Sequence, residues 1–352
     1  MALMQCTCGG IDVHAHVVPE HFPAWLGDAA PAGWPSTVLA AAQGGLCHRH
    51  VMIDGKQYRT VSEKCWSVPH RLADLPAMGL THQVLSPMPE LLSYWLELAP
   101  ARQLLRYLNE QTAAMVHEGG GALLGLAAVP LQDIDAAIDE LHHAVSVLGL
   151  VGVEIGSNVN GVPIGAPRFL PFFQACEALD VPVFVHALKP AGMDRLVGPA
   201  PLQQVLAYPT DVGLAAASVI TSNLMLACSR LRLAFSHGGG TLAMLLPRLQ
   251  QGWQVFPALR DSITASPREQ ARQLFVDTLA FDAPTLQHLV HTFGASQLMV
   301  GSDYPFNFHE RTPLARLAEA GLDEHTSRAL AFDNARRFLG PRAGSALALE
   351  QP

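Results

Sequence analysis

The 352-residue chain is 49% hydrophobic and 15% charged, a composition that indicates a large core and excludes a disordered chain. Its formal net charge is -8, and it has no run of Lys or Arg able to follow a phosphate backbone, which argues against nucleic acid and favours a small-molecule partner. It also lacks both the roughly 18 successive apolar residues of a membrane span and the features of a secretion signal, so we expect a cytoplasmic protein without a membrane partner.

Eight short apolar segments recur along the chain, and a longer helix-like segment follows each. Because the segments are almost continuously apolar, they are typical of parallel strands that are covered on both faces. In chain order, the expected strands are Ile11–His16, His82–Pro87, Ala122–Val129, Val151–Ile155, Pro182–His186, Leu231–His237, Leu274–Thr278 and Gln297–Gly301.

The segment after Pro130 illustrates the expected helices. Asp133 can cap its start and Gly149 can end it. Its apolar residues repeat at steps of three and four positions: Ile134, Ile138, Leu141, Val145 and Leu148. Eight strand-then-helix units predict a single-domain (β/α)8 (TIM) barrel over residues 1–340. A doubly wound open sheet is the alternative, because periodicity does not show closure, but the chain has no dinucleotide-binding fingerprint.

Two parts of the chain depart from this pattern. Residues 18–72 are rich in Pro, Gly, His and Trp and contain two β-like pieces, Cys47–Ile53 and Gln57–Val61. We interpret them as a small insertion after the first strand, on the face of the barrel where active sites lie. The tail from Gly340, residues 341–352, has no periodic pattern and is expected to be frayed.

Side chains of the types that bind metals stand where the expected strands end. His14 and His16 end the first strand, His186 ends the fifth, His237 ends the sixth and Asp303 follows the eighth. Each has an ordinary structural explanation, such as a hydrogen-bonded core histidine for His186 or a turn residue for Asp303. Five such residues at the catalytic face of one barrel are better explained by a shared site.

The spacing His14-Ala15-His16 suits metal binding, because alternate side chains of a strand point to the same face. With His186 and Asp303, the pair predicts a mixed nitrogen and oxygen site for zinc, with manganese as an alternative. A divalent ion lowers the pKa of its bound water toward neutrality, and His237, with an unperturbed pKa of about 6.5, is suited to take that proton and return it.

The chain resembles the amidohydrolase superfamily, and within it the branch of 2-amino-3-carboxymuconate-6-semialdehyde decarboxylase and related decarboxylases. The resemblance covers the whole barrel in order, and HGGG together with GSDYPF is specific to this branch. It rests on the segments IDVHAHVVPEHFP, HRLADLPAMGLTHQVLSPMP, AAVPLQDIDAAI, VPVFVHAL, SHGGGTLAMLLPRL, LFVDTLAF and LMVGSDYPF.

Roles for individual residues follow from this resemblance. It implies that zinc is bound by the ligand set His14, His16, His186 and Asp303. It also implies that His237 and Asp303 are catalytic and that Arg59 binds a substrate carboxylate. Arg248, in LLPRL, would reach the site of a neighbouring subunit, so the resemblance implies a homodimer. Guanidinium groups suit these roles because they offer two parallel donors to a carboxylate.

The chain departs from the branch after the fifth-strand histidine, where Pro and often an aromatic residue are typical. Here the sequence is His186-Ala187-Leu188-Lys189-Pro190, and we hypothesise that Lys189 adds a positive charge toward an acidic substrate. Unchanged kinetics in the variant Lys189→Met would show that Lys189 does not have this role.

The resulting hypothesis is a metal-dependent, non-oxidative decarboxylase of a carboxylated muconate semialdehyde or a hydroxylated aromatic acid from ring catabolism. It needs no organic cofactor, because the conjugated substrate can accept the electrons left behind. The alternative within enzymes is a metal-dependent hydrolase or hydratase of a lactone, amide or carbon–carbon bond, since related barrels redirect one site through their loops. A barrel that only binds ligands is disfavoured, because all five site residues are present.

Overall fold

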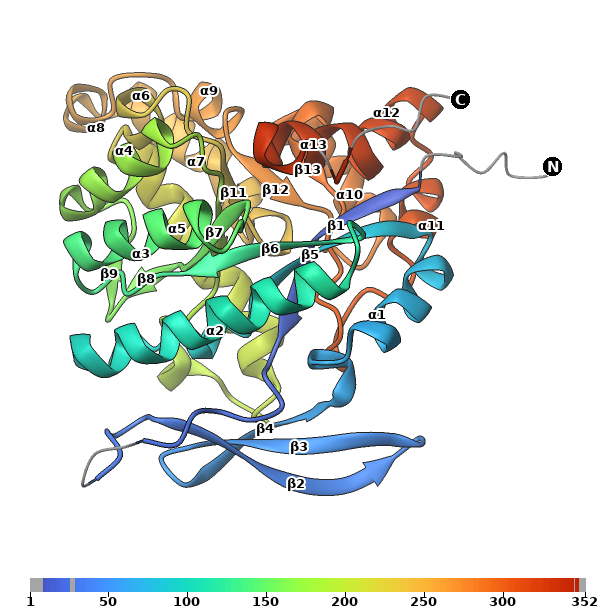
Figure 1. The fold of residues 1–352 in the computed structure, drawn as a ribbon. Coiled ribbons are helices and arrows are strands. Elements are labelled where there is room, and N and C mark those ends of the chain that lie inside the picture. Colours follow the sequence, from blue (N-terminus) through green and yellow to red (C-terminus); the bar gives the residue numbers. More distant parts are fainter. Residues whose placement is uncertain (1–8, 26–28, 345, 348–352) are drawn as a thin grey trace.

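The computed structural model describes residues 9–25, 29–344 and 346–347. Its centre is an eight-stranded sheet whose neighbouring strands are all parallel (Figure 1). The strands, in their order around the sheet, are β1 (Gly10–Val17), β5 (Leu80–Pro87), β6 (Leu123–Ala128), β7 (Gly152–Gly156), β10 (Val183–His186), β11 (Leu233–Phe235), β12 (Phe275–Asp277) and β13 (Leu298–Met299).

The sheet closes because β1 also pairs with the segment that follows β13. The Val13 amide donates to the Val300 carbonyl oxygen at 2.9 Å, and the His16 amide donates to that of Tyr304 at 2.7 Å. Each of the eight expected strands coincides with an observed one. The predicted (β/α)8 barrel is therefore confirmed, and the open doubly wound alternative is wrong.

Helices surround the barrel in Figure 1. In α3 the predicted cap is present, since Asp133 Oδ1 accepts from the Ala136 amide at 2.9 Å. Gly149, with φ of 72°, lies beyond Val147, at which this helix is capped. The helices are α1 (Val68–Asp74), α2 (Leu98–Glu118), α3 (Ile134–Ser146), α4 (Leu170–Ala178), α5 (Tyr208–Thr221), α6 (Leu224–Ala227), α7 (Leu242–Val255), α8 (Pro257–Ser262), α9 (Pro267–Ala271), α10 (Ala283–Phe293), α11 (Pro313–Glu319), α12 (Glu324–Arg328) and α13 (Asn334–Leu339).

The insertion after β1 forms a three-stranded antiparallel sheet that lies below the barrel in Figure 1. Its strands β3 (Leu46–Ile53) and β4 (Lys56–Ser62) match the two predicted β-like pieces. Its edge strand β2 (Pro35–Gln43) was not predicted, because its sequence PSTVLAAAQ is rich in alanine, which has low β-propensity, and is largely exposed. A second, two-residue pairing joins β8 (Asn158–Val159) to β9 (Val162–Pro163).

The end of the barrel away from this insertion is sealed by a separate hydrophobic cluster. Ile11 of β1, Phe184 of β10 and Phe338 of α13 are buried in it, together with Ala343 and Leu347. The prediction of a frayed tail from Gly340 is therefore wrong for the described part, because burial of these apolar side chains holds it against the barrel. Among the described helices, none combines the length and the apolar character needed to cross a membrane.

Candidate metal centre

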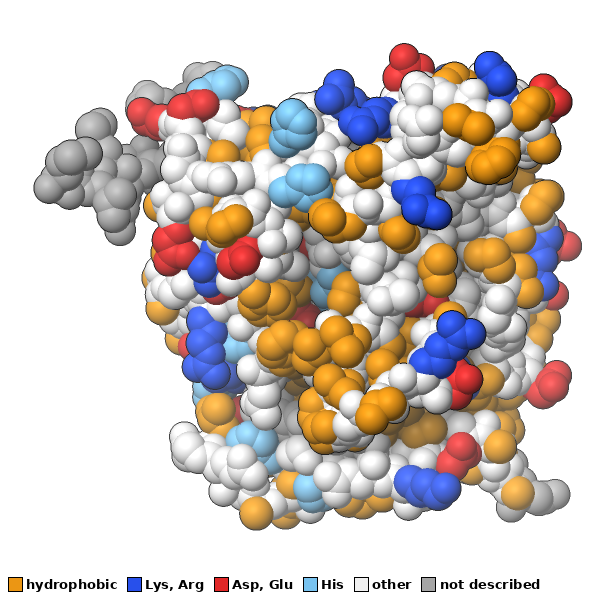
Figure 2. All heavy atoms as spheres, turned by 180° about the vertical axis from the view of Figure 1, so that it is seen from behind, with side chains coloured by type: hydrophobic (Ala, Val, Ile, Leu, Met, Phe, Trp, Pro, Cys, Tyr) orange, Lys and Arg blue, Asp and Glu red, His pale blue; other side chains and the backbone are white. Residues whose placement is uncertain are grey.

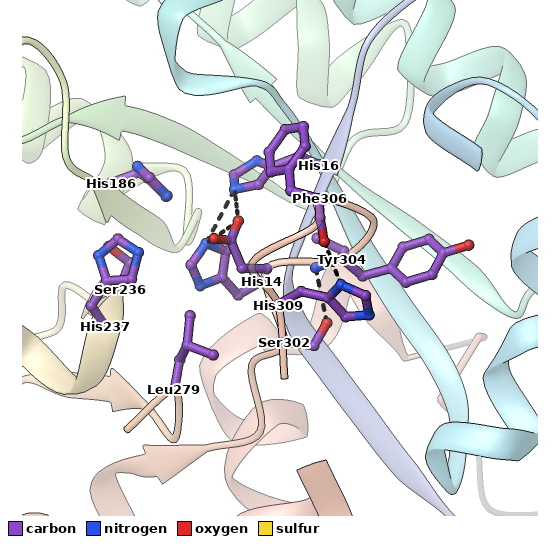
Figure 3. A network of polar contacts seen from close by, with 12 residues as sticks. His14, His16, His186, Ser236, His237, Leu279, Ser302, Tyr304, Phe306 and His309 are labelled. Carbon is purple, nitrogen blue, oxygen red and sulfur yellow. Dashed lines mark hydrogen bonds and ion pairs between the residues drawn. The ribbon is translucent and has the colours of Figure 1, made fainter. Parts of the chain in front are cut away.

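The candidate site lies at the carboxyl ends of the barrel strands. His14 and His16 come from β1, His186 ends β10 and His237 follows β11 (Figure 3). Asp303 follows β13 and completes the group. The structure thus brings together all five residues that the sequence predicts at this site.

Four of these residues present ligand atoms to one point. One atom from each of His14, His16, His186 and Asp303 lies within 4.8 Å of the others. His14 Nε2 and His16 Nε2 are 3.1 Å apart, and His16 Nε2 is 3.2 Å from Asp303 Oδ1. His186 Nε2 is buried and has no hydrogen-bond partner among the described residues. A buried polar atom without a partner is rare in proteins, and this one belongs to a residue of the converging ligand group.

The opposite nitrogen of each imidazole contacts an acceptor that has no proton to give. His14 Nδ1 lies 2.7 Å from Asp277 Oδ2, and His16 Nδ1 lies 3.2 Å from the Pro87 carbonyl oxygen. His186 Nδ1 lies 2.9 Å from the Ala187 carbonyl oxygen. We therefore assign the proton of each neutral imidazole to Nδ1, so that in the metal-binding form its Nε2 has a lone pair. Three lone pairs and a carboxylate fit a divalent cation, and the Nδ1 contacts are those that fix metal-binding histidines.

Asp277, at the end of β12, supports the site and was missed from the sequence. Besides His14, its carboxylate accepts from the main-chain amides of His237 at 3.0 Å, Gly238 at 2.7 Å and Leu279 at 3.1 Å. Burial opposes its ionisation, but the hydrogen bond from His14 and the nearby histidines lower its pKa. Its place at a strand end was a usable signal, since the ligands share it.

In the metal-free site, the surroundings of His14 and His237 give these two histidines different pKa values. Burial disfavours charge on His14, but its hydrogen bond to Asp277 and the Asp303 charge raise its pKa to about 9. Burial and the adjacent His14 lower the pKa of His237 to about 4. At neutral pH His237 is therefore a neutral imidazole that can accept a proton.

His237 stands beside the ligand group rather than within it. Its ring centroid lies 4.9 Å from that of His186 and 5.4 Å from that of His14. His237 and Asp303 both have a positive backbone φ, 54° and 64° respectively, which residues other than glycine rarely adopt. Such strain concentrates at functional positions, where surrounding structure holds it.

A cavity of about 260 Å³ opens beside these residues, a volume at the small end of ligand-binding pockets. His186, His237 and Asp303 line it. Arg59, from β4 of the insertion, also lines it, and its guanidinium carbon lies 4.3 Å from the ring centroid of Phe306. The insertion therefore delivers the predicted carboxylate-binding arginine to the metal centre.

The other two predicted substrate-binding residues lie outside this cavity. Arg248 is exposed on α7. Lys189 Nζ lies 3.5 Å from the ring centroid of Trp95, and the residue lines a different cavity together with Asn158. The structure does not bring either residue to the metal centre of its own chain.

A polar group on the cavity wall was also missed from the sequence. Glu90, which follows β5, accepts hydrogen bonds from the hydroxyls of Tyr58 and Tyr208. Glu90 lies three residues beyond a strand end and Tyr58 precedes Arg59, so their neighbours gave a signal. Tyr208 begins a helix and gave none.

A (β/α)8 barrel with this ligand set at the carboxyl ends of its strands defines a metal-binding barrel enzyme. The chain belongs to the amidohydrolase family, whose sequence profile matches residues 11–340. It is 33% identical to a 2-amino-3-carboxymuconate-6-semialdehyde decarboxylase from Dictyostelium discoideum, over 94% of this chain and 91% of that protein. The predicted family and its decarboxylase branch are confirmed.

Solved structures of other proteins have a similar fold. The apo form of Metarhizium anisopliae IDCase has a TM-score of 0.78 and 18% identity, covering 95% of this chain and 97% of that chain. A dihydroxybenzoic acid decarboxylase from Polaromonas sp. JS666, with bound manganese and the inhibitor 2-nitroresorcinol, has a TM-score of 0.67 and 20% identity. It covers 80% of this chain and 88% of that chain. At these identities the likeness supports the fold.

Proposed function

We propose that this protein is a metal-dependent, non-oxidative decarboxylase of a carboxylated muconate semialdehyde or a hydroxylated aromatic acid. The observation that carries the proposal is the convergence, in one small cavity, of a four-residue ligand set, a neutral imidazole and a guanidinium group. Relatives named as decarboxylases support the reaction type.

Zinc is the proposed metal, with manganese as the alternative, because three imidazoles and one carboxylate suit both. His14, His16, His186 and Asp303 would hold it. A bound divalent ion supplies Lewis acid chemistry, polarising an oxygen atom of the substrate. The conjugated substrate accepts the electron pair of the broken bond, so we propose no organic cofactor.

The chain's own residues position the substrate and move a proton. Arg59 binds a carboxylate through parallel N–H donors, which fixes the orientation of the conjugated system. The carbon–carboxylate bond breaks, its electron pair stays on the substrate carbon, and carbon dioxide leaves. His237 takes a proton from water at a ring nitrogen and passes it to that carbon.

The test of this function measures carbon dioxide release against incorporation of oxygen from labelled water. Zinc-loaded protein is incubated in H2¹⁸O with carboxylated intermediates of aromatic catabolism. A decarboxylase releases carbon dioxide and gives a product with one carboxylate fewer and no ¹⁸O in newly formed groups. A product that keeps every carboxylate and gains ¹⁸O would instead identify a hydrolase or hydratase.

Zinc binding is expected to release about one proton near pH 7.5, because the raised pKa of His14 leaves that imidazole protonated in the metal-free site. The sign follows directly: metal binding needs the neutral ligand, so affinity falls as pH falls below about 9. Calorimetric titrations in buffers of different ionisation enthalpy measure the proton count. Zinc affinity that is unchanged between pH 6 and pH 9 would contradict the assigned state of His14.

A homodimer is proposed with Arg248 near its interface. Hydrophobic side chains gather on the back face of the molecule (Figure 2). On α7 and just beyond it, Met244 is 73% exposed and Phe256 is 59% exposed, on either side of Arg248 in the sequence. Exposed apolar side chains near a charged residue are typical of an interaction surface.

Subunit mixing tests the proposed role of Arg248 in a neighbouring site. Arg248→Ala and His237→Ala are each expected to be nearly inactive alone. Exchange of the two proteins forms mixed dimers in which one site has both His237 and the partner's Arg248, so activity should recover to about a quarter of wild type. Activity that stays at the level of the separate variants would place Arg248 outside the partner site.

The role of Lys189 in substrate binding stays a prediction.

A further inference from the structure

Glu90 lines the cavity that holds Arg59 and His237, and one oxygen of its carboxylate is unpaired. It lies in the short 3-10 helix η3 (Pro89–Leu92) directly after β5 and is 7% exposed. Its Oε1 accepts from both Tyr58 and Tyr208, the latter at 2.5 Å, whereas its Oε2 is buried without a hydrogen-bond partner in the part of the chain that the structure describes. The two oxygens of one carboxylate therefore differ.

The two tyrosines fix this asymmetry. Burial and the neighbouring charge of Glu90 raise the pKa of Tyr58 and of Tyr208 well above the usual range, so both hydroxyls stay protonated and donate. Because both donors meet Oε1, the carboxylate cannot turn without losing two hydrogen bonds. An acceptor held in this way and left unpaired is costly unless a ligand supplies the missing donor.

Arg59 lies near this carboxylate. In the described part of the chain its guanidinium forms no ion pair within 4.0 Å and packs on Phe306. Burial disfavours its charge, but the charge of Glu90 is close enough to raise its pKa. The cavity thus offers a cation without a direct carboxylate contact and a carboxylate oxygen without a hydrogen-bond donor. A ligand that satisfies both must carry an acceptor at one position and a donor at another.

We propose that Glu90 is a specificity-determining residue that selects substrates with a hydroxyl or amino donor in addition to the carboxylate bound by Arg59. This inference rests on the proposed function and narrows its substrate class. The negative charge of Glu90 also opposes a second carboxylate at its position. At the position that meets Glu90, a hydroxyl or amino group is therefore preferred to a carboxylate.

Binding of matched probes to the zinc-loaded protein tests the proposal without relying on turnover. The probes are the three hydroxybenzoate isomers with their methyl ethers, and the three aminobenzoates with their dimethylamino counterparts. Calorimetry gives each Kd. At least one hydroxy or amino isomer is expected to bind about 10-fold to 100-fold more tightly than its methylated partner, and the two series show which donor is preferred.

Glu90→Gln provides the sharpest readout. The tyrosines continue to donate to the amide oxygen, so the amide NH2 takes the place of Oε2 and becomes a donor. The preference for the hydroxy or amino probe should therefore be lost, because the oxygen of a hydroxyl and that of a methyl ether can both accept from the amide N–H. In Glu90→Leu the preference should disappear, and in the control Gln204→Leu, which alters a polar residue on the same cavity, it should stay.

The outcomes separate this proposal from the proposed function. Loss of the preference in Glu90→Gln, with folding checked by thermal melting, supports the proposal even when no carbon dioxide is released from any acid. Equal binding of the paired probes to wild type, or an unchanged preference in Glu90→Gln, overturns it even in an active decarboxylase. Failure of every isomer to bind wild type also counts against it.

Discussion

His237→Ala is expected to keep its metal and lose turnover by a factor of about 10² to 10⁴, the usual contribution of a positioned acid/base. The reason is geometric. The imidazole lines the cavity with its ring 4.9 Å from that of His186, but it does not belong to the four-residue ligand group. Its removal leaves that group intact while deleting the proton carrier.

Metal content measured by mass spectrometry and kcat measured with the identified acid check this expectation together. His142→Ala, on the exposed side of α3, is the matched control and should change neither value. A metal-free His237→Ala protein would falsify the assignment, because it would make His237 a ligand. Near-normal turnover would show that another group transfers the proton.

The barrel could be predicted because its strands are short apolar runs whose burial on both faces leaves a clear pattern. The expected sixth strand, Leu231–His237, illustrates the precision: it contains β11 (Leu233–Phe235) and overshoots it at each end. Closure could not be predicted, since it depends on pairing of β1 with the segment after β13, such as Val13 with Val300. That pairing is a tertiary fact without a local signature.

The two fold errors have related causes. β2 is an exposed edge strand rich in alanine, so its pairing with β3 gives it structure that its own composition does not indicate. The tail was expected to be frayed because it has no repeating pattern. Two of its apolar side chains, Ala343 and Leu347, are buried against the end of the barrel and hold the described part of the tail there. Tertiary contacts decided both cases.

The ligand residues could be predicted because strand geometry alone places them. His14 and His16 share a face by alternation, and His186 and Asp303 follow strand ends. Residues that act through others were harder to find. Asp277 orients His14, and the arrangement of Glu90 depends on a tyrosine from a distant helix. Such roles exist only after the chain has folded.

Asp303→Ala is expected to lose both metal and activity, in contrast to His237→Ala. Asp303 is the only anion in the ligand group, so its removal leaves three neutral imidazoles. Burial opposes its ionisation, but the contact with His16 and the charge of the nearby histidines lower its pKa to about 2, which keeps it charged across the working pH range. Zinc content, and the rise in Tm that zinc gives to wild type, are the measurements.

Asp303→Asn separates charge from shape in the same experiment. The amide keeps an oxygen near His16 Nε2 but removes the negative charge, so zinc affinity should fall by at least about 10-fold to 100-fold while the melting temperature of the metal-free protein stays close to wild type. If Asp303→Ala bound zinc as wild type does, the metal would have to be held by the histidines alone. His237→Ala with metal and Asp303→Ala without it would together divide the five converging residues into ligands and a proton carrier.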